Sequence, residues 1–240
     1  MDRSAAASHL LLEQAAALLL PSRVLMTRAS LYPVHEIDDI VARCQRGDGA
    51  AFRLLFVRHR VDVARLVFRM VGPRSDLEDL IQEVFLQVYK SLKDFKGQAK
   101  FTTWLHRVTV NVVLMDRRAA KSRPQLVAPP VSDLEPDGRI APDEDVARHQ
   151  RARALRRILD RLGEKKRTVF VLHELEGLPP AEIAVIVGAP VLTVRTRLFY
   201  ARRELALLLK EEPSLAAFAA AFERSSEPLG DVVKAVEEAR

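Results

Sequence analysis

The stretch 175–205 constrains the fold most strongly, because it reads as two short helices joined by a tight turn. The pair Pro179-Pro180 favours the start of the first helix, and Gly188 stands where a left-handed residue would end it. After Pro190 a second helical pattern places one apolar stripe on its inner side: Val194, Leu198, Ala201 and Leu205. These features together predict a helix-turn-helix.

The opposite face of the second helix carries cations, hydroxyls and aromatic rings. Its members are Thr193, Arg195, Thr196, Arg197, Phe199, Tyr200, Arg202 and Arg203. An arginine can donate two hydrogen bonds to guanine in a major groove, and hydroxyls can bind phosphates. The pattern therefore predicts binding to duplex DNA. The alternative is a solvated basic helix within a bundle, because arginine is also a good helix former.

The composition of the 240 residues is compatible with a nucleic-acid partner but does not distinguish it from other partners. A hydrophobic fraction of 48% is enough for the core of one large or two small domains. The net charge of +6 favours a polyanion, although an anionic membrane or an acidic protein would also fit. Cys44 is the single cysteine, which excludes an internal disulfide and a cysteine-rich zinc site and fits a cytoplasmic setting. No apolar run approaches membrane-spanning length, so we expect no membrane partner.

Helical periodicity also dominates residues 37–123, where breaks near 47–49, 72–73 and 97 predict four helices. The third helix is the clearest, since Ser75 and Glu78 are spaced as a capping box. Its predicted apolar face consists of Leu77, Leu80, Ile81, Val84, Phe85, Val88 and Leu92.

The remaining segments complete an all-α organisation of two small helical domains. Residues 124–147 are rich in Pro, Asp and Glu and predict an acidic flexible linker, for which a plain solvated tether is the simplest reading. Residues 148–209 then form a second four-helix domain that ends in the helix-turn-helix. Residues 1–36 are either a mis-assigned start, with Met26 as the true one, or an extra docking helix. Residues 210–240 form a C-terminal extension that either docks on a partner or covers the second domain.

Two consecutive runs carry a family resemblance: DLEDLIQEVFLQVYKSL, and then DFKGQAKFTTWLHRVTVNVVLMDRR. With the basic last helix they resemble bacterial sigma factors of the sigma-70 family, in particular the two-domain extracytoplasmic-function group. The resemblance implies a subunit that binds core RNA polymerase, places it at minus-35 and minus-10 promoter elements and helps to melt the latter. It also implies promoter DNA and an anti-sigma factor as partners, and no catalytic residues, metal or cofactor.

The first domain would then hold the main contact with the polymerase. On its third helix Asp79, Gln82 and Glu83 form a polar, acidic ridge beside the apolar stripe. By resemblance this ridge, with Phe85 and Leu86 at its border, binds the β′ clamp helices, and the β flap is a further contact. An exposed acidic helix face without a partner is the alternative.

The next segment would open the DNA. Unstacking costs a few kcal/mol per base, which a protein can offset by capturing an extruded base and stacking an aromatic ring on what remains. By resemblance the pocket for a flipped minus-10 base consists of Phe95, Lys96, Gly97, Gln98, Ala99 and Lys100. Arg107 and Asn111 would contact the promoter nearby, and Arg117, Arg118, Lys121 and Arg123 would hold phosphates. Trp104 would lie at the fork, although a lone tryptophan is as readily a core residue.

The second domain would read the minus-35 element with the outer face of its last helix. Arg195, Thr196, Phe199 and Arg202 match the family best as base contacts, with Arg197 and Arg203 as phosphate contacts. Leu192 and Tyr200 depart from the family, which often has Gly and a basic residue at these positions. The acidic linker would thread the polymerase cleft toward the RNA exit path.

Two other functions remain open on the residues alone. A stand-alone helix-turn-helix regulator would bind duplex tightly by itself, but it leaves residues 76–111 unexplained. An enzyme could use Asp76, Glu78, Asp79 and Glu83 as acid/base groups or metal ligands, yet no Gly-rich phosphate loop, nucleophile elbow or HExxH pattern accompanies them. Cys44 beside Arg43 is either structural or a redox sensor made reactive by its cationic neighbour.

Overall fold

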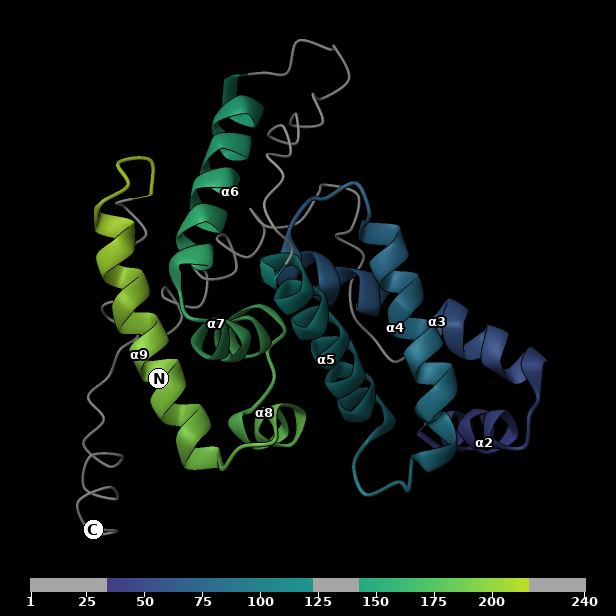
Figure 1. The fold of residues 1–240 in the computed structure, drawn as a ribbon. Helices are drawn as coiled ribbons and strands as arrows, with labels where there is room; N and C mark the ends of the chain where they lie inside the picture. Colours follow the sequence, from purple (N-terminus) through teal and green to yellow (C-terminus); the bar gives the residue numbers. More distant parts are fainter. Residues whose placement is uncertain (1–33, 123–142, 216–240) are drawn as a thin grey trace, which may run out of the picture. The chain divides into compact units, whose positions relative to one another are not determined.

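The computed structural model describes residues 34–122 and 143–215, and every regular element in these two stretches is helical (Figure 1). They fall into two compact units, the N-terminal unit (34–122) and the C-terminal unit (143–215). The predicted all-α fold with two small helical domains is confirmed. The predictions for the N-terminal extension, for most of the acidic linker and for nearly all of the C-terminal extension concern residues outside the described ranges.

The N-terminal unit contains the four helices expected from the sequence. They are α2 Val34–Gln45, α3 Gly49–Val71, α4 Leu77–Ser91 and α5 Phe101–Ser122, with one 3-10 turn, η1, over Leu92–Asp94. Helix α3 packs against α2, α4 and α5, so its inner side chains, such as Leu55 and Leu66, form the centre of the core. Burying side chains of this size stabilises a fold by roughly 1.5–3 kcal/mol each.

The breaks between these helices follow from capping chemistry. The carboxylate of Asp48 accepts hydrogen bonds from the backbone amides of Ala50 and Ala51, at 2.8 and 3.1 Å, and so caps the start of α3. Gly72 ends the same helix with a φ of 89°, a conformation that a side chain would strain. The predicted breaks near residues 47–49 and 72–73 are therefore confirmed.

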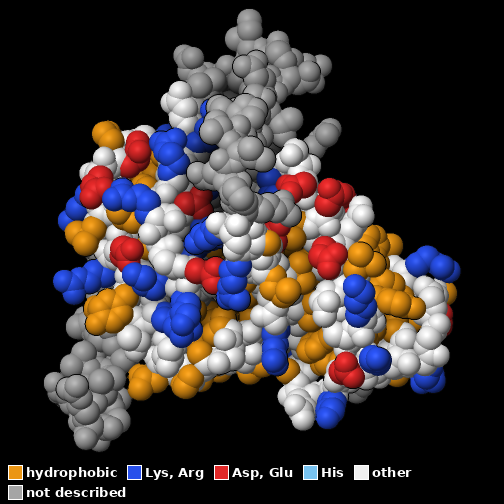
Figure 2. All heavy atoms as spheres, viewed as in Figure 1, with side chains coloured by type: hydrophobic (Ala, Val, Ile, Leu, Met, Phe, Trp, Pro, Cys, Tyr) orange, Lys and Arg blue, Asp and Glu red, His pale blue; other side chains and the backbone are white. Residues whose placement is uncertain are grey.

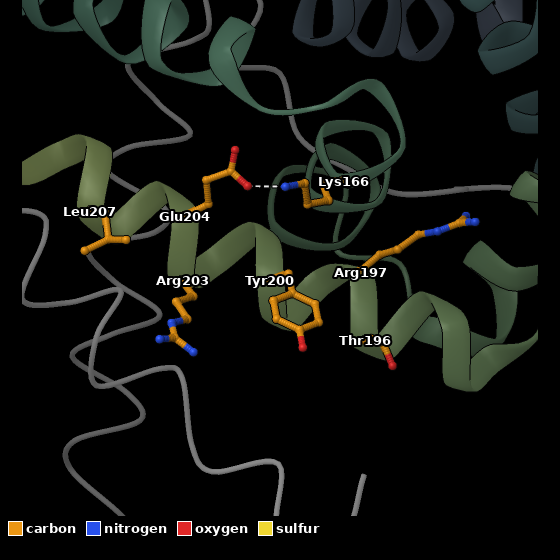
Figure 3. A pocket seen from close by; sticks show the side chains of 7 residues that line it. All are labelled: Lys166, Thr196, Arg197, Tyr200, Arg203, Glu204 and Leu207. Atoms are coloured by element: carbon orange, nitrogen blue, oxygen red, sulfur yellow. Dashed lines mark hydrogen bonds and ion pairs between the residues drawn. The ribbon is translucent and has the colours of Figure 1, made fainter. Parts of the chain in front are cut away.

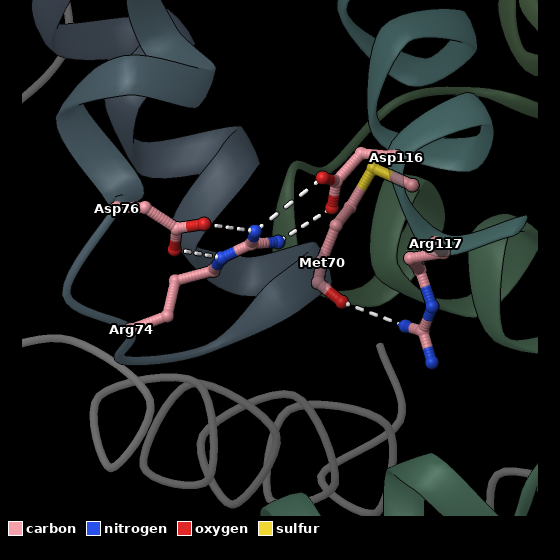
Figure 4. A network of polar contacts seen from close by, with 5 residues as sticks. All are labelled: Met70, Arg74, Asp76, Asp116 and Arg117. Carbon is pink, nitrogen blue, oxygen red and sulfur yellow. Dashed lines mark hydrogen bonds and ion pairs between the residues drawn. The ribbon is translucent and has the colours of Figure 1, made fainter. Parts of the chain in front are cut away.

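The predicted capping box at the start of α4 is wrong. The helix begins at Leu77 with Asp76, not Ser75, at the cap position, and no side chain caps it. The carboxylate of Asp76 instead binds Arg74, which also binds Asp116 of α5 (Figure 4). Glu78 accepts two hydrogen bonds of 2.8 Å from Arg60 of α3. Arg60, 18 residues before Glu78, has thus taken the carboxylate that the local pattern assigned to the helix end.

The C-terminal unit also contains four helices in its described residues. These are α6 Asp143–Arg161, α7 Glu164–Phe170, α8 Pro180–Val187 and α9 Val191–Lys210, and one π-helical turn, η2 (Val171–Leu175), extends α7. Helix α9 contacts α6, α7 and α8 and buries the predicted stripe from Val194 to Leu205. Helix α6 begins at Asp143, five residues before the domain boundary expected from the composition.

Within the two described stretches, no single helix is long and apolar enough to span a membrane. Only α8 and α9 taken together satisfy that test, and they are bent by 102° with respect to each other.

Candidate nucleic-acid and polymerase interfaces

The turn between α8 and α9 has the geometry of a helix-turn-helix. Pro180 is the first residue of α8, and Gly188 ends it in the left-handed region, with φ 62° and ψ 44°. The angle of 102° between the two helices lies in the range typical of this motif. Because Val194, Leu198 and Ala201 are buried, the opposite face of α9 is the one that it presents outward.

That outer face carries most of the residues expected to contact DNA. Figure 2 shows Lys and Arg side chains, with a few carboxylates among them, over the side of the C-terminal unit formed by α9. Arg195, Tyr200 and Arg203 are exposed. Four further members of the predicted set are half-buried: Thr193, Thr196, Arg197 and Phe199. The rings of Phe199 and Tyr200 meet edge to face, with their centroids 5.3 Å apart.

Arg202, expected as a base contact, is bound to a carboxylate of its own unit. Its Nε and one terminal nitrogen bind the carboxylate of Glu174 in η2, at 2.7 and 2.6 Å. The Glu174 side chain is only 6% exposed, and a buried carboxylate is costly without a charged partner. Arg202 therefore joins α9 to the π-helical turn behind it and is a positioning residue in this fold. The partners lie 28 residues apart in the sequence, so no local pattern reveals this pair.

The predicted minus-10 loop is held at its base by a cluster of aromatic rings. Phe95 lies 5.8 Å from Phe101 and 5.3 Å from Trp104, measured between ring centroids. Trp104 is half-buried and also contacts Phe101, so packing accounts for part of its ring, as the core alternative expected. Phe95 is likewise half-buried, and it anchors the loop to the start of α5.

Beyond this anchor the loop is open. Lys96, Gly97, Gln98 and Lys100 are exposed and Ala99 is half-buried. Gly97 has a φ of 70°, which favours glycine, and nothing would contact a β-carbon placed there. Arg107 and Asn111 are exposed one helical turn apart on α5. Loop and helix thus both present exposed amide and cationic groups next in sequence to the aromatic cluster.

A residue that the sequence pattern did not reveal fixes this loop. The side-chain amide of Gln45, the last residue of α2, donates to the carbonyls of Leu92 and Phe95 at 3.1 and 2.8 Å. These carbonyls lie 47 and 50 residues away in the sequence, and only the folded chain brings them together.

The predicted polymerase-binding ridge on α4 is exposed, with one correction. Asp79, Gln82 and Glu83 are exposed, and the Leu86 side chain is 52% exposed. Phe85, expected at the border of the ridge, is a core residue and is only 4% exposed. The centroid of its ring lies 4.6 Å from that of Phe56 of α3. Its place on the predicted apolar stripe already indicated this burial.

The thiol of Cys44 does not have the environment of a reactive cysteine. Burial and the nearby Asp48 carboxylate raise the pKa of Cys44, and Arg43 lowers it less. Arg43 is itself bound to Asp48 at 2.8 Å. The redox alternative needed a lowered pKa, whereas the structural alternative fits this half-buried side chain. Among the described residues no cluster of His, Cys, Asp or Glu could hold a metal ion.

Two helical units, the second with a basic helix-turn-helix face, define a two-domain nucleic-acid-binding protein. The sequence matches the family Sigma-70 region 2 over residues 55–123 and the family Sigma-70, region 4 over residues 152–205. It is 37% identical over 175 residues to the ECF RNA polymerase sigma-E factor of Escherichia coli K12, covering 69% of this chain and 90% of that protein. The sigma-E factor of Haemophilus influenzae is 35% identical over 170 residues, covering 68% and 89%.

The fold agrees with these relationships. The solved structure of CnrH in complex with the cytosolic domain of CnrY covers 72% of this chain and 96% of that one, with 25% identity and a TM-score of 0.53. The chain belongs to the extracytoplasmic-function group of RNA polymerase sigma factors. It therefore directs promoter recognition, and the alternative of a stand-alone regulator is not favoured. Sigma factors are transcription-initiation factors and not enzymes, so membership of this family also argues against the enzyme alternative.

Proposed function

We propose that the two units divide promoter recognition, with the C-terminal unit reading the minus-35 element and the N-terminal unit opening the minus-10 element. The observation that carries this division is that each unit has its own core and its own exposed polar site. We assign the opening of the minus-10 element to a domain of residues 37–123 and the reading of the minus-35 element to a domain of residues 148–209, joined by the acidic linker 124–147.

The minus-35 contact rests on the outer face of α9. Arg195 is exposed near the start of the helix, where a recognition helix meets base edges, and Thr196 and Phe199 lie beside it. Arg197 and Arg203 would hold phosphates on either side, with Thr193 and Tyr200 at the edges of the contact. Arg202 supports this face through Glu174 and does not read a base.

The minus-10 contact rests on the open loop above the aromatic cluster. A base that leaves the stack can enter the space bordered by residues 96–100, while Arg107 and Asn111 contact the neighbouring strand. The edge of Trp104 that the cluster leaves exposed can stack against the fork. Arg118 and Lys121 are exposed near the end of α5 and suit phosphates, whereas Arg117 donates to the Met70 carbonyl at 3.1 Å and helps to hold α3 to α5 (Figure 4).

The ridge on α4 would bind core RNA polymerase. Asp79, Gln82 and Glu83 offer carboxylates and an amide to a basic coiled coil such as the β′ clamp helices, and Leu86 adds an apolar contact. The β flap is a further contact, and an anti-sigma factor is a further partner, in line with the CnrH relative solved with CnrY. These partners place the protein in the cytoplasm.

One experiment tests the function as a whole. The chain is reconstituted with bacterial core polymerase, and the transcripts started on genomic DNA are sequenced. We expect a set of start sites that share paired upstream elements. Start sites no more frequent than with the core enzyme alone would contradict the proposal.

A second experiment tests the division between the units. The double variant Lys100→Ala and Asn111→Ala should impair open-complex formation more than closed-complex binding, because it removes groups that hold the extruded base and its neighbour. Permanganate reactivity of the minus-10 thymines reports opening, and gel retardation at low temperature reports closed complexes. Lys93→Ala is the matched control, since Lys93 is an exposed lysine before the loop. Equal loss of both complexes in the double variant would refute the division.

A further inference from the structure

An open groove runs along the outer face of α9 beside α7. It encloses about 580 Å³, and its lining on α9 extends from Thr196 to Leu207. Figure 3 shows Tyr200 and Arg203 on the same side of α9, whereas Lys166 of α7 meets Glu204 on another side. The groove therefore has an apolar floor of Tyr200 and Leu207 and a mainly cationic border of Lys166, Arg197 and Arg203, with Glu204 as the one carboxylate of its lining.

The minus-35 contact does not explain the apolar floor. Leu207 is 58% exposed and Tyr200 is 52% exposed. Leu207 lies 12 residues after Arg195, which is about 18 Å further along a helix and beyond the base pairs that Arg195 can reach. A leucine also offers nothing to a phosphate. An apolar side chain from elsewhere would suit this end of the groove better than DNA does.

The chain itself supplies a segment with the right starting point. Leu215 is 1% exposed, so the chain is fixed to the C-terminal unit five residues after α9 ends. The groove spans 12 residues of α9, or about 16 Å, and seven extended residues after Leu215 reach about 23 Å. A segment tethered this closely is present at an effective concentration of about a millimolar or more, so weak contacts suffice to hold it.

The sequence of that segment complements the groove. Phe218 and Phe222 are its first large apolar residues, and Glu223 and Glu227 follow them. Residues 216–240 carry five carboxylates and three cations, whereas the groove border is cationic. A second copy of the protein placed on the same groove would bring Arg203 against a like charge. The chain's own C-terminal segment is therefore the better occupant.

We propose that residues 216–240 fold back onto this groove, with Phe218 and Phe222 packed against Leu207 and Tyr200 and carboxylates near Arg203. The docked segment covers Tyr200, Arg203 and Thr196 and so competes with minus-35 DNA for the outer face of α9. This competition rests on the proposed minus-35 function, whereas the docking does not. The segment is then an intramolecular inhibitor of promoter binding that minus-35 DNA must displace.

The docking is tested without DNA by fluorine NMR of the full chain. The sequence has three tyrosines, Tyr32, Tyr89 and Tyr200, so 3-fluorotyrosine gives few resonances, and Tyr200→Phe assigns the one of interest. We expect the double variant Phe218→Ala and Phe222→Ala to shift the Tyr200 resonance and to raise its sensitivity to solvent. Leu229→Ala, which truncates an apolar residue later in the segment, should leave the resonance in place.

The competition is tested with the same variants in complex with core polymerase. If the docked form accounts for about nine molecules in ten, removing the two rings should raise the affinity for a minus-35 duplex about tenfold. A Tyr200 resonance that the double variant leaves unchanged, or that depends on protein concentration as a second copy would require, overturns the docking. A shifted resonance with no duplex binding by any variant leaves the docking in place and refutes the minus-35 assignment instead.

Discussion

The two proposed DNA sites of this sigma factor depend on the rest of the fold to different extents. The minus-35 site is the outer face of one helix, and its exposed members, such as Arg195, take no part in the core. The loop proposed for the minus-10 contact instead depends on two helices, because Gln45 of α2 holds its backbone and the rings of α5 hold Phe95. Substitutions should therefore separate binding from stability in the C-terminal unit and couple them in the N-terminal unit.

The largest effect is expected from Phe101→Ala. Phe101 is 4% exposed and contacts Phe95, Trp104 and His59, so its removal leaves a cavity beneath the loop. Truncating a buried phenylalanine costs about 3–5 kcal/mol of unfolding free energy. Urea unfolding of the full chain, followed by the fluorescence of its single tryptophan, Trp104, measures this loss.

Phe199→Ala is the matched control in the C-terminal unit. Its ring is half-buried and contacts the exposed Tyr200, so we expect a loss of less than about 1 kcal/mol. The unfolding of each variant is followed by a probe in its own unit. Equal losses of unfolding free energy would contradict the claim that the loop depends on the core more than the outer face of α9 does.

The pH dependence of stability provides a second test of the N-terminal unit, through the buried His59. His59 is 6% exposed and stacks on Phe101, and burial lowers its pKa to about 4, with Arg58 and His106 lowering it and Asp62 raising it. The unfolded chain binds the proton near the ordinary value of about 6.5, so the stability from neutral His59 is present above pH 6.5 and is lost as the pH falls toward 4. The loss should reach about 3 kcal/mol at pH 4.

The measurement is the urea midpoint of the N-terminal unit, followed by Trp104 fluorescence between pH 7 and pH 4. His59→Gln lacks the titrating group and should show a clearly weaker dependence over this range. A slope that is the same in both proteins would mean that other groups cause the acid sensitivity.

Local patterns predicted the elements because the signals for them are local. The stripe from Val194 to Leu205, the left-handed Gly188 and the breaks between the helices depend on neighbours in the sequence, and the structure confirms each of them. The same reasoning failed at the start of α4, where Arg60 of α3 binds the Glu78 carboxylate of the predicted capping box. Arg60 lies 18 residues before Glu78, so this pairing becomes visible only in the folded chain.

The site residues divide in the same way. Whether a side chain on the outer face of α9 is exposed follows from helical spacing, and this holds for Arg195 and Arg203. Whether an arginine there is available depends on partners elsewhere, as with Arg202 and Glu174. Gln45 could not be predicted, since a polar residue at a helix end gives no sign of a carbonyl 50 residues later.

Arg202→Ala tests the role that the structure gives this residue. The change leaves the Glu174 carboxylate, 6% exposed, without its charged partner, so we expect a loss of about 3 kcal/mol in the unfolding free energy of the C-terminal unit. Circular dichroism during urea unfolding measures it. The double variant Arg202→Met with Glu174→Gln should recover much of the stability, because no charge is then left buried. If the Arg202→Ala protein is as stable as the parent protein but binds duplex DNA more weakly, Arg202 contacts DNA and is not mainly a positioning residue.

Arg195→Ala should weaken DNA binding and leave the stability of the C-terminal unit unchanged. Arg195 is exposed, so its loss should leave the unfolding free energy within about 0.5 kcal/mol of that of the parent protein. If its guanidinium donates to a base, affinity of the holoenzyme for the minus-35 element falls by about 1–3 kcal/mol, and preference at one base pair is relaxed. Competition between duplexes that differ at single positions separates this outcome from a phosphate contact, which would weaken all duplexes alike. Lys165→Ala, a change of the same charge at an exposed position of α7, is the control for the general loss of positive charge.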